Sequence, residues 1–443
     1  MTSILTPLPR FTLTFSATDR LYNNAKIGTN IVVESQLSRI FVSEGHLIDS
    51  GMLASILNGI IDEKADYEIL DFDIGKTNLE TSRIELDVRC DSAEQLVTVT
   101  ERLVEHGCHE KRVSEAATQP AEAGGCVPED FYSTTNHRTE VFSGGEWRVV
   151  GSQRMDGVIV IENGQPVCRK LRDVRAGDEV VCSTESIRLF PPERERLSDS
   201  FGFMGGDVSS ERSIDVAVNQ LADALIDSRT HGRKIVMVAG PVLVHAGGSD
   251  AFQYLIREGF LGALLSGNAL AVHDIEHALF GTSLGLDLKT GRPAPGGHRN
   301  HMRGINVIRR HGSIQNAIDS GALKAGIMYE LIQNSIPYCL AASIRDDGPL
   351  PETLVNIIEA QERYAELVEG ASLVLMLSTM LHSIGVGNML PSGVTTVCID
   401  INPAVVTKLS DRGSSQAIGI VSDVGFFVRA LADRIRSIDN RVE

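Results

Sequence analysis

The clearest pattern along the chain is the alternation, in its C-terminal part, of short, nearly continuous apolar runs with segments of helical period. From about Asp207 we expect helices between the runs, notably at 351–369 and 425–438, and strands at 234–242, 260–266, 337–343, 372–378, 395–400 and 417–421. Strands that are apolar on both faces are typical of a buried parallel sheet. The pattern therefore predicts an α/β fold with a doubly wound, Rossmann-like domain over residues 201–443.

The N-terminal part shows shorter amphipathic segments. Helices at 52–61 and 93–106 and strands at 67–73 and 82–89 suit a ferredoxin-like two-layer sandwich. Residues 107–130 are rich in Gly, Ala and Pro without any period, which predicts a linker. We therefore expect an N-terminal α+β domain over residues 1–130.

Between these parts, short β-branched runs are separated by turn residues. Asn163-Gly164 is a hairpin signal, and the turn Ala176-Gly177-Asp178 precedes another strand. The pair Pro191-Pro192, followed by charged residues, marks a boundary. A small β domain over residues 131–200 is the prediction.

Composition limits the possible partners. Of 443 residues, 42% are hydrophobic and 22% charged, which is ordinary globular usage and excludes disordered, collagen-like and coiled-coil proteins. The net charge of −17 opposes binding to nucleic acid and anionic membranes. No window approaches the roughly 18 unbroken apolar residues of a membrane span, and the N-terminus lacks the apolar core of a signal peptide. Seven cysteines without a C-x-x-C pair favour reduced thiols, and we expect a cytoplasmic protein.

Polar or glycine-rich residues follow most of the predicted parallel strands, whose carboxyl ends meet at one edge of the sheet. Asp400 falls about 20 residues beyond the start of the loop 378–388, the spacing of the Rossmann acid that binds the ribose of NAD. The loop and the next helix N-terminus would hold the pyrophosphate. An acid there repels a 2′-phosphate, which favours NAD over NADP. The alternative is a tight strand–helix turn, because Gly385-Val386-Gly387 lies late in the loop and lacks a third glycine.

The motif His273-Asp-Ile-Glu276-His277 fits H-x-x-E-H, a zinc-peptidase pattern with both histidines on one helix face and Glu as the base. It also lies in the first turns after Gly267-Asn268, where a doubly wound fold places ligand-binding side chains. We favour a substrate or cofactor contact without a metal. Zinc hydrolysis and an ordinary helix surface are the alternatives.

Three further groups are candidates for binding. Arg299 or Arg303, in a basic Gly/Pro loop, matches a carboxylate in geometry, unless the loop is merely solvated. Asp346 and Asp347 follow a predicted strand and suit a substrate ammonium or the nicotinamide ribose, or else a helix cap. His382 at a helix start is expected to have a lowered pKa, which suits a neutral hydrogen-bonding role.

Four stretches carry a resemblance to a known family: GCVPEDFYSTTNHRTEVFSGGEWRVV, QRMDGVIVI, LLSGNALAVHDIEHALFGTSLG and LSTMLHSIGVGNMLPSGVTTVCIDINP. They resemble the archaeal-type ornithine cyclodeaminases, which share a region with lysine–oxoglutarate reductase/saccharopine dehydrogenase proteins. The chain also resembles the C-terminal part of cyanobacterial bifunctional arginine dihydrolases. The resemblance covers nearly the whole chain. The arginine-dihydrolase part has no counterpart here, so arginine hydrolysis is not expected.

The resemblance implies a tightly held NAD and conversion of L-ornithine to L-proline plus ammonia. By similarity, the NAD contacts fall on Asn268, Ala269, Asp347, Thr379, Met380, Leu381, His382, Asp400 and Asp423, with Asn402 at the same strand end as Asp400. The reaction requires oxidation at the α-carbon, attack of the δ-amine on the resulting imine, loss of ammonia and re-reduction.

The reaction also requires a base, an acid and groups that bind the amines. Asp347, His273 and Glu276 are the candidates for proton transfer and amine binding, and Arg299 or Arg303 for the carboxylate. A net oxidoreductase of the saccharopine or opine type, a zinc hydrolase and a non-catalytic nucleotide-binding protein are the alternative functions. We expect a homo-oligomer.

Overall fold

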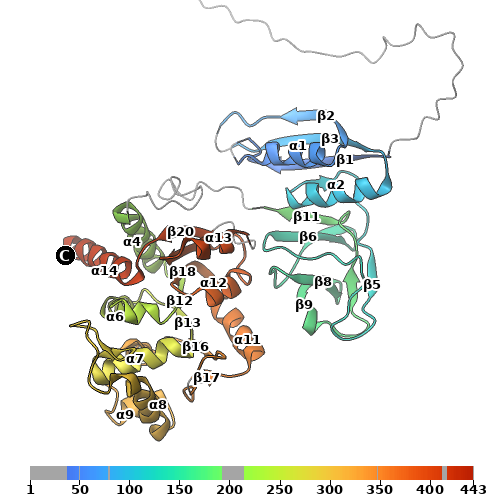
Figure 1. Ribbon diagram of the computed structural model, residues 1–443. Helices are drawn as coiled ribbons and strands as arrows, with labels where there is room; N and C mark the ends of the chain where they lie inside the picture. Colours follow the sequence, from blue (N-terminus) through green and yellow to red (C-terminus); the bar gives the residue numbers. More distant parts are fainter. Residues whose placement is uncertain are drawn as a thin grey trace, which may run out of the picture.

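The apolar runs of the C-terminal part form one seven-stranded parallel sheet (Figure 1). The computed structural model describes residues 37–48, 50–77, 80–191, 214–346, 348–411 and 417–442. From edge to edge the strands are β17 (Thr353–Leu354), β16 (Tyr338–Ala341), β13 (Ala263–Gly267), β12 (Lys234–Ala239), β18 (Ala371–Leu377), β19 (Thr395–Asp400) and β20 (Ala417–Val421). The predicted Rossmann-like sheet is confirmed, and β19 and β20 have the predicted bounds.

Both faces of the sheet are buried because side chains alternate along each strand. On β12, Met237 packs into the cluster on one face, whereas Val236 and Val238 pack into the cluster on the other. The first face is covered by α4 (Ile214–Thr230), α5 (Val242–His245), α6 (Ser249–Arg257), α7 (Asn268–Phe280), α8 (Asn300–His311), α9 (Ile314–Asp319), α10 (Ile327–Gln333) and α14 (Val424–Val442). The second is covered by α11 (Ile357–Val368), α12 (Met380–Gly387) and α13 (Pro403–Asp411).

The order of the strands places a switch point between β12 and β18. From β12 the chain moves outward to β13, β16 and β17, and then returns to the opposite side of β12 at β18. The loops after these two strands touch, since the N–H of Gly240 donates to the carbonyl oxygen of Leu377 at 2.9 Å. A Cβ atom at Gly240 would lie 2.3 Å from the carbonyl oxygen of Ser378, so only glycine fits this approach. Ligands of doubly wound folds bind at such a point.

One predicted helix begins later than expected. Residues 351–356 do not belong to α11, and two of them form β17. Long-range contacts hold this segment, because Leu350 N and Thr353 Oγ1 both donate to Asn268 Oδ1, at 3.0 and 2.9 Å. Asn356 then caps α11 by accepting a hydrogen bond from Ile358 N at 3.0 Å. The period of the segment alone does not contain this information.

The N-terminal part is an antiparallel sheet with two helices packed against it. Its elements are β1 (Leu37–Gly45), α1 (Met52–Asp62), β2 (Asp66–Asp73), β3 (Ser82–Cys90), α2 (Ala93–Glu105) and β4 (His109–Glu110), in the sheet order β2-β3-β1-β4. This βαββαβ arrangement is ferredoxin-like. The sequence did not predict β1, although Phe41 on this central strand is fully buried.

The middle part contains two small antiparallel sheets, ordered β5-β10-β8-β9 and β11-β6-β7. Their strands are β5 (Thr118–Pro120), β6 (Arg138–Ser143), β7 (Glu146–Val149), β8 (Gly157–Glu162), β9 (Gln165–Lys170), β10 (Glu179–Val181) and β11 (Ile187–Phe190). The hairpin at Asn163-Gly164 is confirmed, with φ values of 52° and 75°. The linker predicted at 107–130 is wrong in part, because β4 and β5 lie within it. Both are too short to give a periodic signal.

Helices α11 and α12 lie on the side of the parallel sheet that faces the middle β sheets (Figure 1). The two parts are joined there by hydrogen bonds from Met155 N to Asn388 O at 3.3 Å and from Ser392 N to Asn136 O at 3.0 Å. In the part of the chain that the structure describes, no helix combines the length and the apolar character needed to cross a membrane.

Candidate functional site

The turn from β18 into α12 leaves the start of that helix available to a ligand. Ser378 adopts a φ of 47°, a left-handed conformation that non-glycine residues rarely take and that is concentrated at functional sites. Thr379, the N-cap residue, makes no capping hydrogen bond with its side chain. The first N–H groups of α12, in Met380, Leu381 and His382, therefore face outward with the positive end of the helix dipole. Such a helix start binds phosphate groups.

Acidic and amide side chains follow the next two strands. Asp400 ends β19, is buried, and accepts a hydrogen bond from Asn402 N at 2.8 Å. Asn402 in turn accepts from Ala404 N at 3.0 Å, which caps α13. Asp423, beyond β20, is exposed and accepts from Phe426 N at 2.7 Å at the start of α14. Asp400 thus stands at the end of the strand next to the uncapped helix.

These features fit a dinucleotide. The β18–α12–β19 unit offers free N–H groups for a pyrophosphate and a carboxylate for a ribose, in the arrangement of a Rossmann mononucleotide half. Gly240 gives the close backbone approach between β12 and β18. The donor set suits NAD, and Asp400 disfavours a 2′-phosphate.

His382 is held by a chain of hydrogen bonds that fixes its tautomer. Tyr364 Oη lies 2.6 Å from the carbonyl oxygen of Ser266 and 2.8 Å from His382 Nδ1. Because the single phenolic hydrogen is directed to the carbonyl, Nδ1–H of His382 donates to Tyr364, and Nε2 keeps its lone pair. A Cβ atom at Gly267, the last residue of β13, would lie 3.0 Å from Nε2. Burial lowers the pKa of His382, which favours the neutral ring that the sequence suggested.

Asn268 and Ala269 begin α7, directly after β13. Asn268 is buried, and its side-chain oxygen Oδ1 accepts the hydrogen bonds from Leu350 N and Thr353 Oγ1. Ala269 is half-buried. Asp346 accepts a hydrogen bond from Ser343 N at 2.8 Å, which closes its own turn. Asp347, a candidate for both the cofactor and the reaction, lies outside the described residues.

His273 and Glu276 form a pair inside the C-terminal domain. His273 Nδ1 lies 2.9 Å from Glu276 Oε2, and the Glu276 side chain has no exposed surface. Its oxygens also accept from Thr282 Oγ1, Leu284 N and Gly285 N, at 2.9, 3.2 and 3.0 Å. These hydrogen bonds and His273 outweigh burial and lower the pKa of Glu276. A carboxylate enclosed in this way orients His273 and cannot activate a metal-bound water.

A second histidine adjoins the pair. The ring of His245, at the end of α5, lies 4.6 Å from that of His273, and its Nδ1 is 2.7 Å from Ser283 Oγ. Burial, with the neighbouring His273, lowers the pKa of His245 to about 4. His301 on α8 stands on the other side, with its ring centroid 6.3 Å from His273. Within the described residues, no three His, Cys, Asp or Glu side chains are placed to hold a metal ion.

The two candidate arginines lie at the start of α8. Arg299 is exposed at the start of α8. The Arg303 guanidinium lies 4.2 Å above the ring of Phe280 and donates to Asn300 Oδ1 at 3.0 Å. Asn300 in turn donates to Thr282 Oγ1, which bonds Glu276. Arg303 is thus connected through Asn300 and Thr282 to Glu276, and not to the start of α12.

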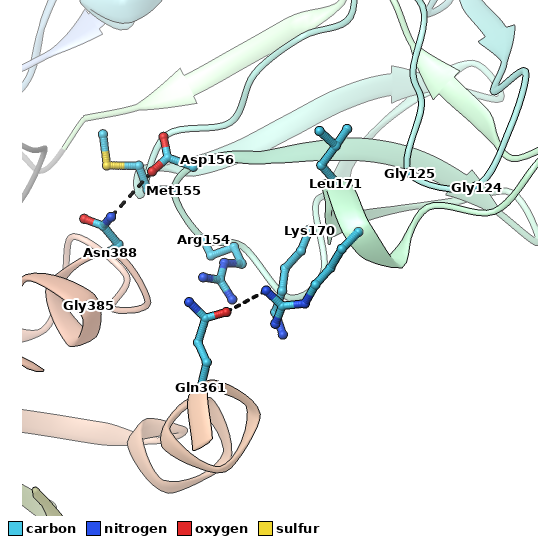
Figure 2. A pocket seen from close by; sticks show the side chains of 11 residues that line it. Gly124, Gly125, Arg154, Met155, Asp156, Lys170, Leu171, Gln361, Gly385 and Asn388 are labelled. Atoms are coloured by element: carbon cyan, nitrogen blue, oxygen red, sulfur yellow. Dashed lines mark hydrogen bonds between the residues drawn. The ribbon is translucent and has the colours of Figure 1, made fainter. Parts of the chain in front are cut away.

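A cavity of about 730 Å³ separates the middle β sheets from α11 and α12 (Figure 2). One wall carries two short segments that sequence analysis gave no role, Arg154–Asp156 and Lys170–Arg172. The other wall is formed by Gln361, Gly385 and Asn388. The QRMD tetrapeptide was part of the resemblance, but without the fold nothing indicated that it faces α12. Tyr364 was missed for the same reason, since no local pattern shows its contact with His382.

Three family models match the chain in succession. The conserved region of bifunctional LOR/SDH enzymes covers residues 38–137, the first C-terminal region of ArgZ-like arginine dihydrolases covers 138–218, and their C-terminal Rossmann fold covers 219–431. The ornithine cyclodeaminase of Methanocaldococcus jannaschii is 46% identical over 403 residues, which span 89% of this chain and 95% of that protein. The chain belongs to the archaeal-type ornithine cyclodeaminase family.

Other members of this family are similar in sequence and in structure. The bifunctional arginine dihydrolase/ornithine cyclodeaminase AgrE of Nostoc is 46% identical over 93% of this chain, which spans only 59% of the length of AgrE. The crystal structure of apo ArgZ, an arginine dihydrolase from cyanobacteria, superposes with a TM-score of 0.79 at 42% identity, over 91% of this chain and 59% of ArgZ. The ternary complex of AgrE with ornithine and NAD+ gives a TM-score of 0.51 at 45% identity, over 92% of this chain and 58% of AgrE. The ornithine cyclodeaminase family thus accounts for the resemblance seen in the sequence.

Proposed function

We propose that the protein is an NAD-dependent ornithine cyclodeaminase that converts L-ornithine to L-proline and ammonia. The observation that carries this proposal is the β18–α12–β19 unit, with an uncapped helix start beside the carboxylate of Asp400. Support comes from the similarity to the archaeal ornithine cyclodeaminases over nearly their whole length and to AgrE, whose structure was solved with ornithine and NAD+.

The residues that would hold NAD surround the switch point of the sheet. Its pyrophosphate suits the N–H groups at the start of α12, and its adenosine ribose suits Asp400. The nicotinamide half then extends toward β13 and β16. The full proposed set is Asn268, Ala269, Asp347, Thr379, Met380, Leu381, His382, Asp400, Asn402 and Asp423. When bound, NAD supplies a two-electron acceptor and donor, so that proline and ammonia form without net oxidation.

The chain's own residues must move protons and bind the amines. His382 has its lone pair at Nε2 beside Gly267, at the carboxyl end of β13, where it can accept a hydrogen bond or a proton. His273, oriented by Glu276, and Asp347 remain candidates for proton transfer and for binding the ammonium groups. Arg299 and Arg303 remain candidates for the carboxylate, although Arg303 already contacts Phe280 and Asn300.

We also propose a domain organisation, a cellular compartment and an oligomeric state. Three domains, at 1–130, 131–200 and 201–443, would correspond to the three groups of sheets. All seven cysteines are free and six of them are buried, which suits a reducing cytoplasm. A homo-oligomer is expected, as for many multi-domain enzymes.

The test is to incubate the purified protein with L-ornithine and a trace of NAD while proline, ammonia and reduced nicotinamide are followed together. Proline and ammonia should appear in equal amounts, far exceed the NAD supplied, and leave NADH flat. NADH that rises in step with product would indicate a net oxidoreductase of the saccharopine or opine type instead. Absence of product from ornithine would contradict the proposed substrate.

A further inference from the structure

The cavity between the middle β sheets and the C-terminal domain is lined by three cations and one carboxylate of the described residues. Arg154 and Lys170 line it from the β side, as Figure 2 shows. Arg172 lines it as well, and Asp156 is the only carboxylate among its described lining residues. Burial is the main cause that lowers the pKa of Arg154 and of Lys170, and the charge of Arg172 lowers both further. Three cations that face a shared space repel each other and favour an anion between them.

The three cations differ in their partners. Arg172 Nη1 donates to Gln361 Oε1 at 2.7 Å across the cavity, and the same guanidinium lies 3.8 Å from both Asp173 and Glu362. Lys170 Nζ lies 3.8 Å from Asp173. Arg154 has no such partner. Its Nε is buried without a hydrogen-bond acceptor. Within the described residues, the charges of Asp156 and Asp173 act on its guanidinium without forming an ion pair with it. A half-buried guanidinium that lacks hydrogen-bond acceptors is suited to bind a carboxylate or a phosphate.

The backbone around Arg154 holds the side chain in place. The carbonyl oxygen of Arg154 accepts a hydrogen bond from Thr134 Oγ1 at 2.7 Å, and Met155 N donates to Asn388 O of the other wall. Asp156 adopts a φ of 59°, and Asn388 Nδ2 lies 3.5 Å from its Oδ2. The turn that presents Arg154 is therefore fixed from both sides of the cavity.

The cavity adjoins the proposed reaction site through two helices. Gln361 lies one turn before Tyr364 on α11, and Gly385 lies one turn after His382 on α12. Side chains one turn apart on a helix are about 5–6 Å apart at Cβ. The wall opposite Arg154 is thus built one turn from both members of the Tyr364–His382 pair. An anionic group at Arg154 is in reach of a molecule that reacts beside His382.

We propose that this cavity, in place of Arg299 and Arg303, binds the α-carboxylate of the amino-acid substrate, with Arg154 as its main partner and Lys170 beside it. The inference rests on the proposed function. We favour a carboxylate over a phosphate as the ligand, because the proposed binding site of the cofactor phosphates is the start of α12. With the carboxylate at Arg154, the ammonium groups of the substrate point away from the three cations, toward His382 and the edge of the sheet.

The test compares L-ornithine with L-ornithinamide, which lacks the carboxylate charge. In Arg154→Gln, kcat/KM for ornithine should fall by roughly 10- to 100-fold, whereas kcat/KM for ornithinamide should change little. Arg154→Lys should recover part of the loss. NAD affinity, measured by equilibrium dialysis, should stay as in the wild type. Arg257→Gln, on α6, removes an arginine outside the site and serves as the control.

Several results would overturn the proposal. One is an unchanged KM for ornithine in Arg154→Gln with intact NAD binding, and another is an equal loss for both substrates. A third is a selective loss for ornithine in Arg299→Gln or Arg303→Gln instead. Should Arg154→Gln fail to fold, Lys170→Met gives the same comparison. If the wild type does not convert ornithine, the proposed function fails, and calorimetric binding of ornithine against ornithinamide to the NAD-loaded protein still tests the cavity.

Discussion

The hydroxyl of Tyr364 and the imidazole of His382 join α11 to α12 through a hydrogen bond of 2.8 Å between Oη and Nδ1. The two residues are 18 positions apart and belong to different helices. The ring of His382 owes its orientation to this bond. Tyr364 is therefore a positioning residue for His382.

Tyr364→Phe removes the partner of Nδ1 and leaves the ring free to change tautomer. We expect kcat for ornithine to fall about tenfold, as for other lost orienting contacts, with a smaller change in KM. The acidic limb of the kcat profile should also move, which a purely structural loss would not cause. Tyr67→Phe, in the N-terminal domain, is the control. An unchanged profile would remove His382 from proton transfer.

Asp400→Asn keeps an oxygen for Asn402 N but removes the negative charge. NAD affinity should decrease by about tenfold or more, and the preference for NAD over NADP should shrink because the repulsion of a 2′-phosphate is gone. Titration of both dinucleotides, followed by protein fluorescence or calorimetry, measures the change. Equal affinities in variant and wild type would place the ribose elsewhere.

Glu276→Ala leaves Thr282, Gly285 and His273 without their buried acceptor. We expect the free energy of unfolding to fall by about 3–5 kcal/mol, measured by urea titration. Glu276→Gln keeps one oxygen and should lose less. The lowered pKa of Glu276 adds a pH dependence, since this stability is present above about pH 4.5 and is lost as the pH falls through the folded-state pKa. A small loss in both variants would mean that the carboxylate is not needed to hold the loop 282–285.

His245 gives the stability a second dependence on pH. Its folded-state pKa of about 4 lies below the unfolded value near 6.5, so the unfolded chain binds the proton first. The melting temperature should therefore drop as the pH falls from 6.5 toward 4. His109, whose pKa burial also lowers to about 4, contributes in the same window. In His245→Gln the melting temperature should fall less steeply with decreasing pH. In His298→Gln, at an exposed position, this dependence on pH should be unchanged.

Gly326→Ala tests a buried cap. Gly326 has a φ of 111°, and an added Cβ would lie 2.7 Å from Oδ2 of Asp274. The two carboxylate oxygens of Asp274 accept hydrogen bonds from Ile327 N and Met328 N at the start of α10. Gly259→Ala is matched, because its φ of 75° is also left-handed but its Cβ would meet nothing within 4 Å. Gly326→Ala should lower the free energy of unfolding by at least about 2 kcal/mol more than Gly259→Ala. Similar losses would show that Asp274 yields easily.

The parallel sheet was predictable because strands buried on both faces are apolar at every position, a signal contained within each strand. The spacing from the loop 378–388, which reflects one local βαβ unit, pointed to Asp400, and the resemblance pointed to the run from Thr379 to His382. Both stay predicted cofactor contacts. The start of α11 and strand β1 were not predicted, since contacts from distant residues decide them. The side-chain oxygen of Asn268, which accepts hydrogen bonds from Leu350 and Thr353, is one such contact.

The cavity was beyond prediction for a related reason. Arg154 lies in the loop between β7 and β8, and Lys170 ends β9; both are ordinary polar positions in the sequence. Only the docking of the middle sheets on α11 and α12 gives them a common space. Arg303 shows the opposite case. Its sequence context suggested a free guanidinium, but the fold supplies Phe280 and Asn300 as partners.

Helix α12 carries His382 near its start, and Asn388, at its end, accepts the hydrogen bond that ties the β domain to it. The number of residues in α12 therefore sets both the distance and the rotation between His382, at the proposed cofactor site, and Asn388, at the contact with the β domain. Since each helical residue turns the chain by about 100°, one residue inserted after Ser383 would rotate Gly385 and Asn388 away from the β domain while His382 kept its place. The eight residues of α12 thus align the C-terminal domain with the β domain. An insertion or deletion in this helix should be tolerated less well than a substitution.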